Sequence, residues 1–161
     1  GRQAYAEVEP TMRAVVAAAS DRRGQLTAAI EDDILAFGGV MDAYRLPKDD
    51  PERPAAIERA MIRAADVPLT VARLALEAMQ LAEQAASLGN RNAASDAAGA
   101  ALIRLAAVEG AALNVRVNAA SLADRDLAAR YENDVAALLA QAREVRTRVV
   151  RIAEERAGLA P

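Results

Sequence analysis

The spacing of apolar residues along the chain predicts a few long helices. Between Pro10 and Pro47, large apolar side chains recur every three or four residues, which is the period of an amphipathic helix. Proline fits the first turn of a helix, and the residue before a proline leaves the helical region. We therefore predict a first helix over about residues 8–45. Its apolar stripe, which we expect to face the core, consists of Leu26, Ile30, Phe37, Val40 and Tyr44, with Ile34 and Met41 at its edge.

A second helix is predicted to begin at Asp49-Asp50-Pro51, where a carboxylate cap precedes a proline. It runs to about Leu88, because Gly89-Asn90 is a typical C-terminal stop. Pro68 lies inside this helix and should kink it, since proline lacks the backbone N–H and its ring clashes with the previous turn. These signals place a kink near the middle of the second helix.

The rest of the chain predicts two more helices. Residues 93–119 are apolar nearly all round, which is typical of a buried helix. Ser121 and Asp124 then form a variant of the capping box that opens the fourth helix. Apolar residues in this last helix alternate steps of four and three, at Leu127, Tyr131, Val135, Leu138, Ala142, Val145, Val149 and Ile152. That spacing predicts a seam against the bundle or against a second subunit.

Composition supports an all-α fold in one domain covering residues 1–161. The chain is 53% hydrophobic and 27% charged, Ala is its commonest residue, and aromatic residues make up only 2%. Short loops favour antiparallel neighbours, so we predict a bundle of long antiparallel helices. A long, narrow bundle leaves much apolar surface for its mass, and we therefore expect a homodimer.

Composition also excludes several chemistries. The chain has neither Cys nor His, which removes thiolate nucleophiles, imidazole bases and the usual metal sites, so we predict no metal. A net charge of −3 and few aromatics argue against binding to nucleic acid. Charged or amide residues interrupt every long apolar run, so we expect no membrane span. No signal peptide is visible, and we expect a cytoplasmic protein.

Three polar residues fall on faces that should be buried. Asp33 lies on the apolar stripe of the first helix, and Asn114 and Asn118 lie one turn apart on the third. Counting residues from the two turns places Asp33, Pro68 and Asn114 at one height near mid-bundle. A buried carboxylate is paired, hydrogen-bonded or functional, so Asp33 is either a candidate acid/base group or one half of a structural ion pair. The two asparagines are either ligands for substrate or a clamp between helices.

A second polar group gathers at the other end of the bundle. Asp96 shares a helix face with Asn114 but lies eighteen residues away, or ~27 Å along the axis. It belongs with Asn90 and Asn92 at the turn before the third helix, and a carboxylate in a first helical turn is also favoured by the helix dipole alone. Lys48 is the only lysine among 20 basic residues, which indicates either a need for a compact ammonium group or chance.

Several short motifs, taken in order, resemble the cyclodeaminase/cyclohydrolase family. They are Leu46-Pro47-Lys48, Val67-Pro68-Leu69, Gly89-Asn90-Arg91-Asn92 with Ser95-Asp96, and Asn114-Val115-x-Val117-Asn118. This family includes the cyclodeaminase domain of formiminotransferase-cyclodeaminase and methenyltetrahydrofolate cyclohydrolase. The resemblance implies an all-helical dimer that binds a tetrahydrofolate derivative as substrate and needs no prosthetic group. It also implies an upstream helix with a Pro-Gly-Gly-Gly segment, which precedes the first residue of this chain.

The resemblance leaves three functions open. The leading hypothesis is hydrolysis of 5,10-methenyltetrahydrofolate to 10-formyltetrahydrofolate. The second is a formiminotetrahydrofolate cyclodeaminase that releases ammonia, and the third is a non-catalytic helical dimerisation module. For either enzyme, the candidate catalytic residues are Asp33, Asp96 and Lys48, with Lys48 acting across the dimer. The candidate substrate-binding residues are Asn90, Asn92, Asn114 and Asn118.

Overall fold

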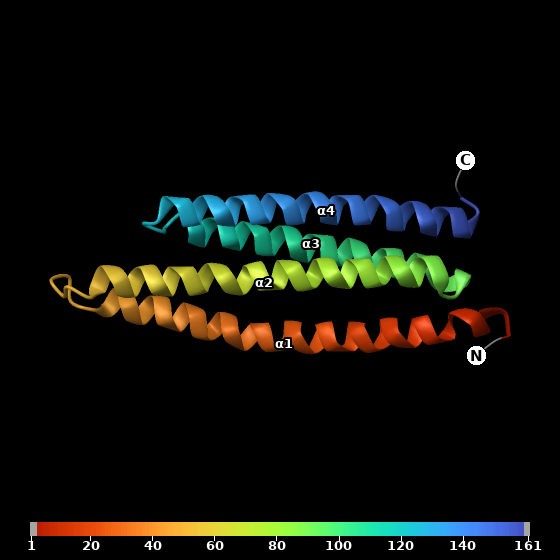
Figure 1. Cartoon of the computed structure of the whole chain (residues 1–161), viewed down its shortest axis with the longest axis horizontal. Helices are drawn as coiled ribbons and strands as arrows, with labels where there is room; N and C mark the ends of the chain where they lie inside the picture. The colour runs from red at the N-terminus through yellow and green to blue at the C-terminus, as the bar shows by residue number, and fades with distance from the viewer. Residues whose placement is uncertain (1–2, 160–161) are drawn as a thin grey trace.

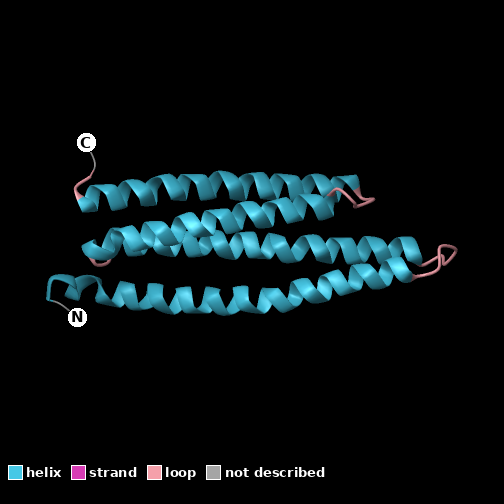
Figure 2. Cartoon of the chain, turned by 180° about the vertical axis from the view of Figure 1, so that it is seen from behind, coloured by secondary structure: helices cyan, strands magenta, loops and turns pink. Residues whose placement is uncertain are grey.

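The computed structural model describes residues 3–159 and consists of four long antiparallel α-helices joined by short connections (Figures 1 and 2). The helices are α1 (Glu9–Arg45), α2 (Arg53–Leu88), α3 (Ala94–Ala119) and α4 (Arg125–Ala157). Two short 3-10 helices, η1 (Gln3–Val8) and η2 (Arg91–Ala93), precede α1 and α3. No strand occurs within residues 3–159, and the predicted all-α bundle is confirmed.

The four helices do not share the core equally. Helices α1 and α4 lie at opposite edges of the molecule in both overall views, with α2 and α3 between them (Figures 1 and 2). The main core is formed by α2, α3 and α4, and its largest fully buried side chains include Met79, Val108, Val115 and Val135. Helix α1 packs chiefly against α2. One side of α1 therefore has no neighbouring helix among residues 3–159.

Helix α4 follows its predicted seam closely. Every residue of that seam is buried or half-buried, and Val135, Ala142, Val145 and Val149 lie deepest. The predicted capping box was wrong, however. Asp124 itself is the N-cap, and its Oδ1 accepts from the backbone N–H groups of Asp126 and Leu127 at 3.0 and 2.9 Å. A carboxylate placed directly before the first turn satisfies the free N–H groups by itself, so the helix begins after Asp124 and not after Ser121.

The buried face of α1 differs from the predicted stripe. Its buried residues are Val15, Ala29, Ala36 and Ala43, which are spaced in multiples of seven. The small alanines let α1 approach α2 closely along this heptad line. Of the larger residues that we expected in the core, Leu26 and Val40 are half-buried, and Val40 packs against the core, but the others are exposed on the outer side. We call Ile30, Ile34, Phe37, Met41 and Tyr44 the outer stripe; their exposed fractions run from 40% to 66%.

Helix α3 is also less buried than its composition predicts. Its inner face is buried, but Leu102, Ile103, Leu113 and Val117 are exposed because no helix of the described part of the chain covers the outer face. Within the described residues, the segment Arg91–Ala119 is long and apolar enough to cross a membrane, judged by length and composition alone. Of its most apolar 18-residue stretch, 33% is buried inside the bundle. The expectation of no membrane span therefore stays a prediction. A core helix of an Ala-rich bundle meets the same criterion as a membrane span, because both kinds of helix are apolar nearly all round.

The two ends of α2 are close to their predicted places. Gly89 caps its C-terminus, as predicted, but the helix starts at Arg53 with Pro54 in its first turn. The predicted start at Pro51 was wrong because Asp50 forms a turn instead, in which its Oδ1 accepts from the N–H of Glu52 at 2.8 Å. The helix continues through Pro68 without a break. The bend expected there stays a prediction.

Candidate active site

A cleft of about 360 Å³ lies between α1, α2 and α3 and is open to solvent. This central cleft has a volume typical of small-molecule sites. It is lined by Leu26, Ala29, Ile30, Asp33, Ile34, Val67, Pro68, Val71, Ala107, Ala111 and Asn114. The walls are mostly apolar, and Asp33 and Asn114 are the only lining side chains with hydrogen-bonding groups. Such a cleft can hold a flat, mostly apolar ligand and orient it by a few polar contacts.

The central cleft brings together the groups that residue counting placed at one height. Asp33 of α1, Pro68 of α2 and Asn114 of α3 all line it. On α1, Asp33 points between the buried alanine line and the outer stripe, which places its carboxylate at the mouth of the cleft. Within residues 3–159, neither Asp33 nor Asn114 has a side-chain hydrogen bond or ion pair. The Asp33 carboxylate therefore has no structural partner in the described chain.

Asn118 does not line the central cleft, contrary to the prediction that it shares a pocket with Asp33. Its Nδ2 donates to the carbonyl oxygen of Ala64 at 2.6 Å, so the side chain joins α3 to α2. This arrangement matches the alternative interpretation of the asparagines as an interhelical clamp. Only Asn114 of the pair faces the cleft.

A second polar pair, which the sequence motifs did not predict, joins α4 to α2. The Tyr131 hydroxyl donates to Oδ1 of Asp66 at 2.6 Å, and Tyr131 is only 6% exposed. Burial raises the pKa of the Tyr131 phenol, and the hydrogen bond and charge of Asp66 raise it further. The signal in the sequence was the phenol itself, since a tyrosine on a core seam needs a hydrogen-bond partner. Near Pro68, α2 is therefore hydrogen-bonded to α3 through Asn118 and to α4 through Tyr131.

We expect Tyr131→Phe to change how stability depends on pH. Below pH about 10, the usual pKa of tyrosine, both folded and unfolded chains keep the phenol proton. Above it the unfolded chain loses the proton while the folded chain retains it, so the parent loses stability as pH rises. The variant should lack this loss of stability at alkaline pH. At pH 7 it should be about 1 kcal/mol less stable than the parent, because it cannot form the hydrogen bond to Asp66.

Urea unfolding at pH 7, 9 and 11 measures both effects. Asp66→Asn is the companion variant and should reduce the alkaline loss without abolishing it, because burial is the largest cause of the raised pKa. If the parent and Tyr131→Phe lose stability equally above pH 10, the buried phenol is not responsible.

The second predicted group lies at the other end of the bundle. Asn90 caps η2, where its Oδ1 accepts from the N–H of Asn92 at 3.1 Å and from the Tyr5 hydroxyl at 3.4 Å. Asp96 is exposed in the first turn of α3. Eighteen residues of helix separate it from Asn114, or ~27 Å. As predicted, one subunit cannot bring these groups to the central cleft.

Asn92 lines a different pocket at this end, together with Arg91, Ser95 and Arg156. Both arginines serve the ends of helices there. Arg156 donates to the carbonyl oxygens of Ser87 and Gly89, and Arg91 donates to that of Arg156. Cationic side chains at helix C-termini satisfy free carbonyl groups and the helix dipole. Helix capping therefore accounts for the two arginines of this pocket.

Lys48 lies in the turn between α1 and α2 and is exposed. No ion pair of its ammonium group is found within residues 3–159. Fifteen residues separate it from Asp33, or ~22 Å along α1. Within one chain, Lys48 joins neither group of candidate residues.

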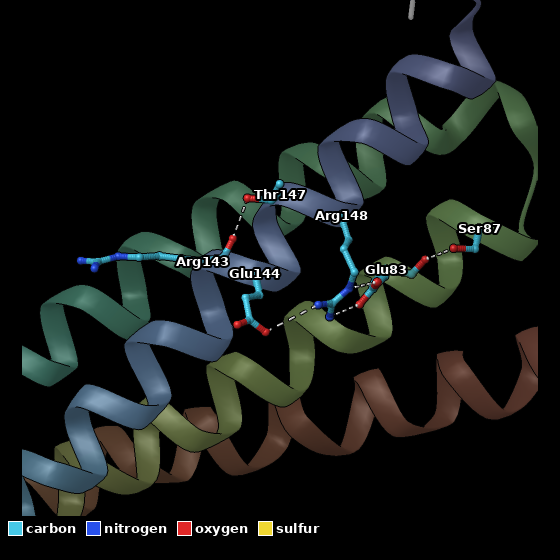
Figure 3. A network of polar contacts seen from close by, with 6 residues as sticks. All are labelled: Glu83, Ser87, Arg143, Glu144, Thr147 and Arg148. Carbon is cyan, nitrogen blue, oxygen red and sulfur yellow. Dashed lines mark hydrogen bonds and ion pairs between the residues drawn. The ribbon is translucent and has the colours of Figure 1, made fainter.

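A further polar network, between α2 and α4, is shown in Figure 3. Arg148 of α4 makes two hydrogen bonds with Glu83 of α2, at 2.6 and 3.0 Å, and lies 4.0 Å from Glu144. Ser87 and Thr147 donate to carbonyl oxygens of their own helices. Exposed ion pairs of this kind contribute little to stability, and the network serves to align two helices.

Comparison with known proteins places these features in a family. The family model described as formiminotransferase-cyclodeaminase matches residues 1–155. The chain belongs to the formiminotransferase-cyclodeaminase family. The resemblance inferred from the sequence motifs is thereby confirmed.

Individual relatives support the same assignment. The chain is 41% identical over 153 residues to the methenyltetrahydrofolate cyclohydrolase of Methylorubrum extorquens, which covers 92% of this chain and 74% of that protein. It is 29% identical over 147 residues to the formimidoyltransferase-cyclodeaminase of Sus scrofa, of which it spans only 27%. The crystal structure of formiminotetrahydrofolate cyclodeaminase from Thermotoga maritima matches with a TM-score of 0.87 and 28% identity, over 96% of this chain and 75% of that one. All three relatives are named as enzymes.

Proposed function

We propose that this protein hydrolyses 5,10-methenyltetrahydrofolate to 10-formyltetrahydrofolate. The observation that carries the proposal is the Asp33 carboxylate, which lies without a structural partner at an apolar cleft in a chain that is 41% identical to a methenyltetrahydrofolate cyclohydrolase. The substrate is a cation whose positive charge lies on the carbon between N5 and N10. A carboxylate beside that carbon stabilises the cation and can accept a proton from water.

The reaction divides into two proton transfers at one carboxylate. Water adds to the bridging carbon while Asp33 takes one of its protons, which gives a neutral tetrahedral adduct. Asp33 then returns that proton to N5 as the bond between carbon and N5 breaks. The remaining hydroxyl proton leaves as the formyl carbonyl forms, so one water is consumed and one proton is released. A single carboxylate beside the bridging carbon suits both steps, because both occur at the same carbon.

The other lining residues have supporting roles in this proposal. The Asn114 amide supplies a donor and an acceptor for the edge of the pterin ring. The apolar walls, including Ile30, Ile34 and Val71, remove bulk water and so strengthen the interaction between the carboxylate and the cation. At the other end of the bundle, Asn90 and Asn92 are proposed to bind substrate and Asp96 to be a catalytic residue in the complete assembly.

Cyclodeamination of formiminotetrahydrofolate is the second candidate. It is supported by the Thermotoga maritima cyclodeaminase, which shares the fold with a TM-score of 0.87. That reaction closes the ring at the same bridging carbon and expels ammonia, so it can use the same carboxylate. The higher identity to the cyclohydrolase places hydrolysis first.

Two assays on the full natural chain decide between these candidates. We expect the absorbance of methenyltetrahydrofolate to fall with enzyme-dependent, saturable kinetics, and we expect no ammonia from formiminotetrahydrofolate. Ammonia release without hydrolysis would assign the cyclodeaminase reaction. Failure to bind either folate would favour a non-catalytic helical module.

We propose further that two copies assemble through the outer stripe of α1 and the uncovered face of α3. Large apolar side chains are exposed on both helices, on either side of the central cleft. In an antiparallel dimer the Lys48 turn of one subunit approaches the Asp96 end of its partner. Lys48 would then pair with a folate carboxylate or with Asp96 across the interface. Parent-like folate affinity and turnover in both Lys48→Arg and Lys48→Ala would remove Lys48 from the site.

A further inference from the structure

Pro68 leaves one backbone carbonyl of α2 without its helical partner. In an α-helix the carbonyl oxygen of Ala64 accepts from the N–H of residue 68, and proline has no N–H. Helix α2 nevertheless continues through this point. Nδ2 of Asn118 donates to this carbonyl oxygen at 2.6 Å. A side chain of α3 thus replaces the hydrogen bond that Pro68 removes from α2.

This replacement lies beside the central cleft. Pro68 lines the cleft, and so does Asn114, which lies one turn before Asn118 on the same helix. The hydrogen bond therefore fixes the height of α3 against α2 where both helices form the wall opposite Asp33. Asparagine is a poor residue for a helix interior, because its amide competes with the helix backbone in other conformations. At residue 118 this cost is offset by a specific carbonyl partner.

We infer that Asn118 is a positioning residue and not a ligand for substrate. It sets the distance between Asn114 and Asp33 across the central cleft by its bond to the carbonyl left free by Pro68. This assignment rests on the proposed function, since the cleft is taken as the folate site. It makes a specific prediction: Asn118 matters only while residue 68 is a proline.

A double-mutant cycle tests this dependence. In Pro68→Ala, residue 68 regains an N–H that can donate to the Ala64 carbonyl, so the amide of Asn118 becomes redundant. In the parent, Asn118→Ala should lower kcat by about 10- to 100-fold, because Asn114 and Asp33 no longer hold the substrate at the right distance; this is the scale of a small misplacement of catalytic groups. In the Pro68→Ala background the same change should lower kcat by no more than about threefold. Asn118→Asp keeps the shape but cannot donate, so it should resemble Asn118→Ala in the parent.

Urea unfolding of the same four proteins gives a readout that is independent of turnover. Asn118→Ala should lower the ratio of folded to unfolded protein by about tenfold in the parent, and by much less in Pro68→Ala. Equal effects of Asn118→Ala on stability in both backgrounds would overturn the inference. So would equal losses of kcat in both backgrounds, which would mean that Asn118 acts independently of Pro68. If the protein proves not to act on folates, the stability cycle still tests the Asn118–Pro68 coupling, so the two failures are distinguishable.

Discussion

Asp33→Asn is expected to lower turnover of methenyltetrahydrofolate by about 10²-fold or more while leaving the fold intact. The amide has nearly the same size as the carboxylate, so the central cleft keeps its shape. It has no charge to stabilise the cationic substrate and cannot accept a proton from water. Because Asp33 makes no hydrogen bond or ion pair within residues 3–159, its substitution breaks no structural contact there. The measurement is the absorbance decay of the substrate at saturating concentration.

The adjacent carboxylate provides a matched control. Asp32 is exposed on the same helix but does not line the central cleft. Asp32→Asn makes the same change of charge one residue away, so it should retain turnover within about twofold, as expected for a surface substitution. Near-normal turnover in Asp33→Asn would move the acid/base role to Asp96 or leave Asp33 without one. Equal losses in both variants would indicate a general effect of charge on α1 and not catalysis by Asp33.

The parts of the fold that were predictable depend on local spacing. The seam of α4 follows from apolar residues at alternating steps of four and three, and all of its residues are buried or half-buried as expected. The central cleft was predictable because helix rise is constant: counting residues from two turns places Asp33, Pro68 and Asn114 at one height. Both inferences need only the geometry of a regular helix and the positions of the turns.

The neighbours of the apolar faces of α1 and α3 could not be predicted from residue spacing. Hydrophobic periodicity gives most weight to large side chains, so the line of Ala29, Ala36 and Ala43 was overlooked as the contact with α2. The outer stripe was correctly recognised as apolar but assigned to the wrong neighbour. Apolar spacing shows that a helix face should be covered, but it does not identify the surface that covers it. In a thin bundle the covering surface can come from another molecule.

Polar contacts between residues far apart in the sequence could not be predicted either. Asp66 and Tyr131 are 65 residues apart, and Asn118 bonds to a carbonyl 54 residues away. Each residue alone indicates only that a partner is needed. Which partner it finds depends on the register of two helices, which small shifts of the connecting turns alter. For the same reason Asn118 was predicted at the cleft, whereas it lies one turn beyond it.

The outer stripe leads to the last prediction, that Phe37→Glu converts a dimer into a monomer. We expect the parent to be a dimer at micromolar concentration in light scattering or analytical ultracentrifugation. Phe37 is 66% exposed and lies at the centre of the outer stripe. An unpaired carboxylate buried in an apolar interface costs several kcal/mol, which corresponds to a rise in the dimer dissociation constant of at least about 10²-fold. Turnover should fall with dimer content if the partner completes the folate site.

Leu35→Glu separates this interface effect from a general effect of charge on α1. Leu35 is two residues from Phe37 and 56% exposed, but it lies on the other side of the helix from the outer stripe. It carries the same new charge and loses a similarly exposed apolar side chain, so it should remain dimeric and active. A monomeric parent would contradict the assembly, and dissociation of both variants would place the interface elsewhere than the outer stripe. A dimer that survives Phe37→Glu would leave the outer stripe free for a partner other than a second copy of this chain.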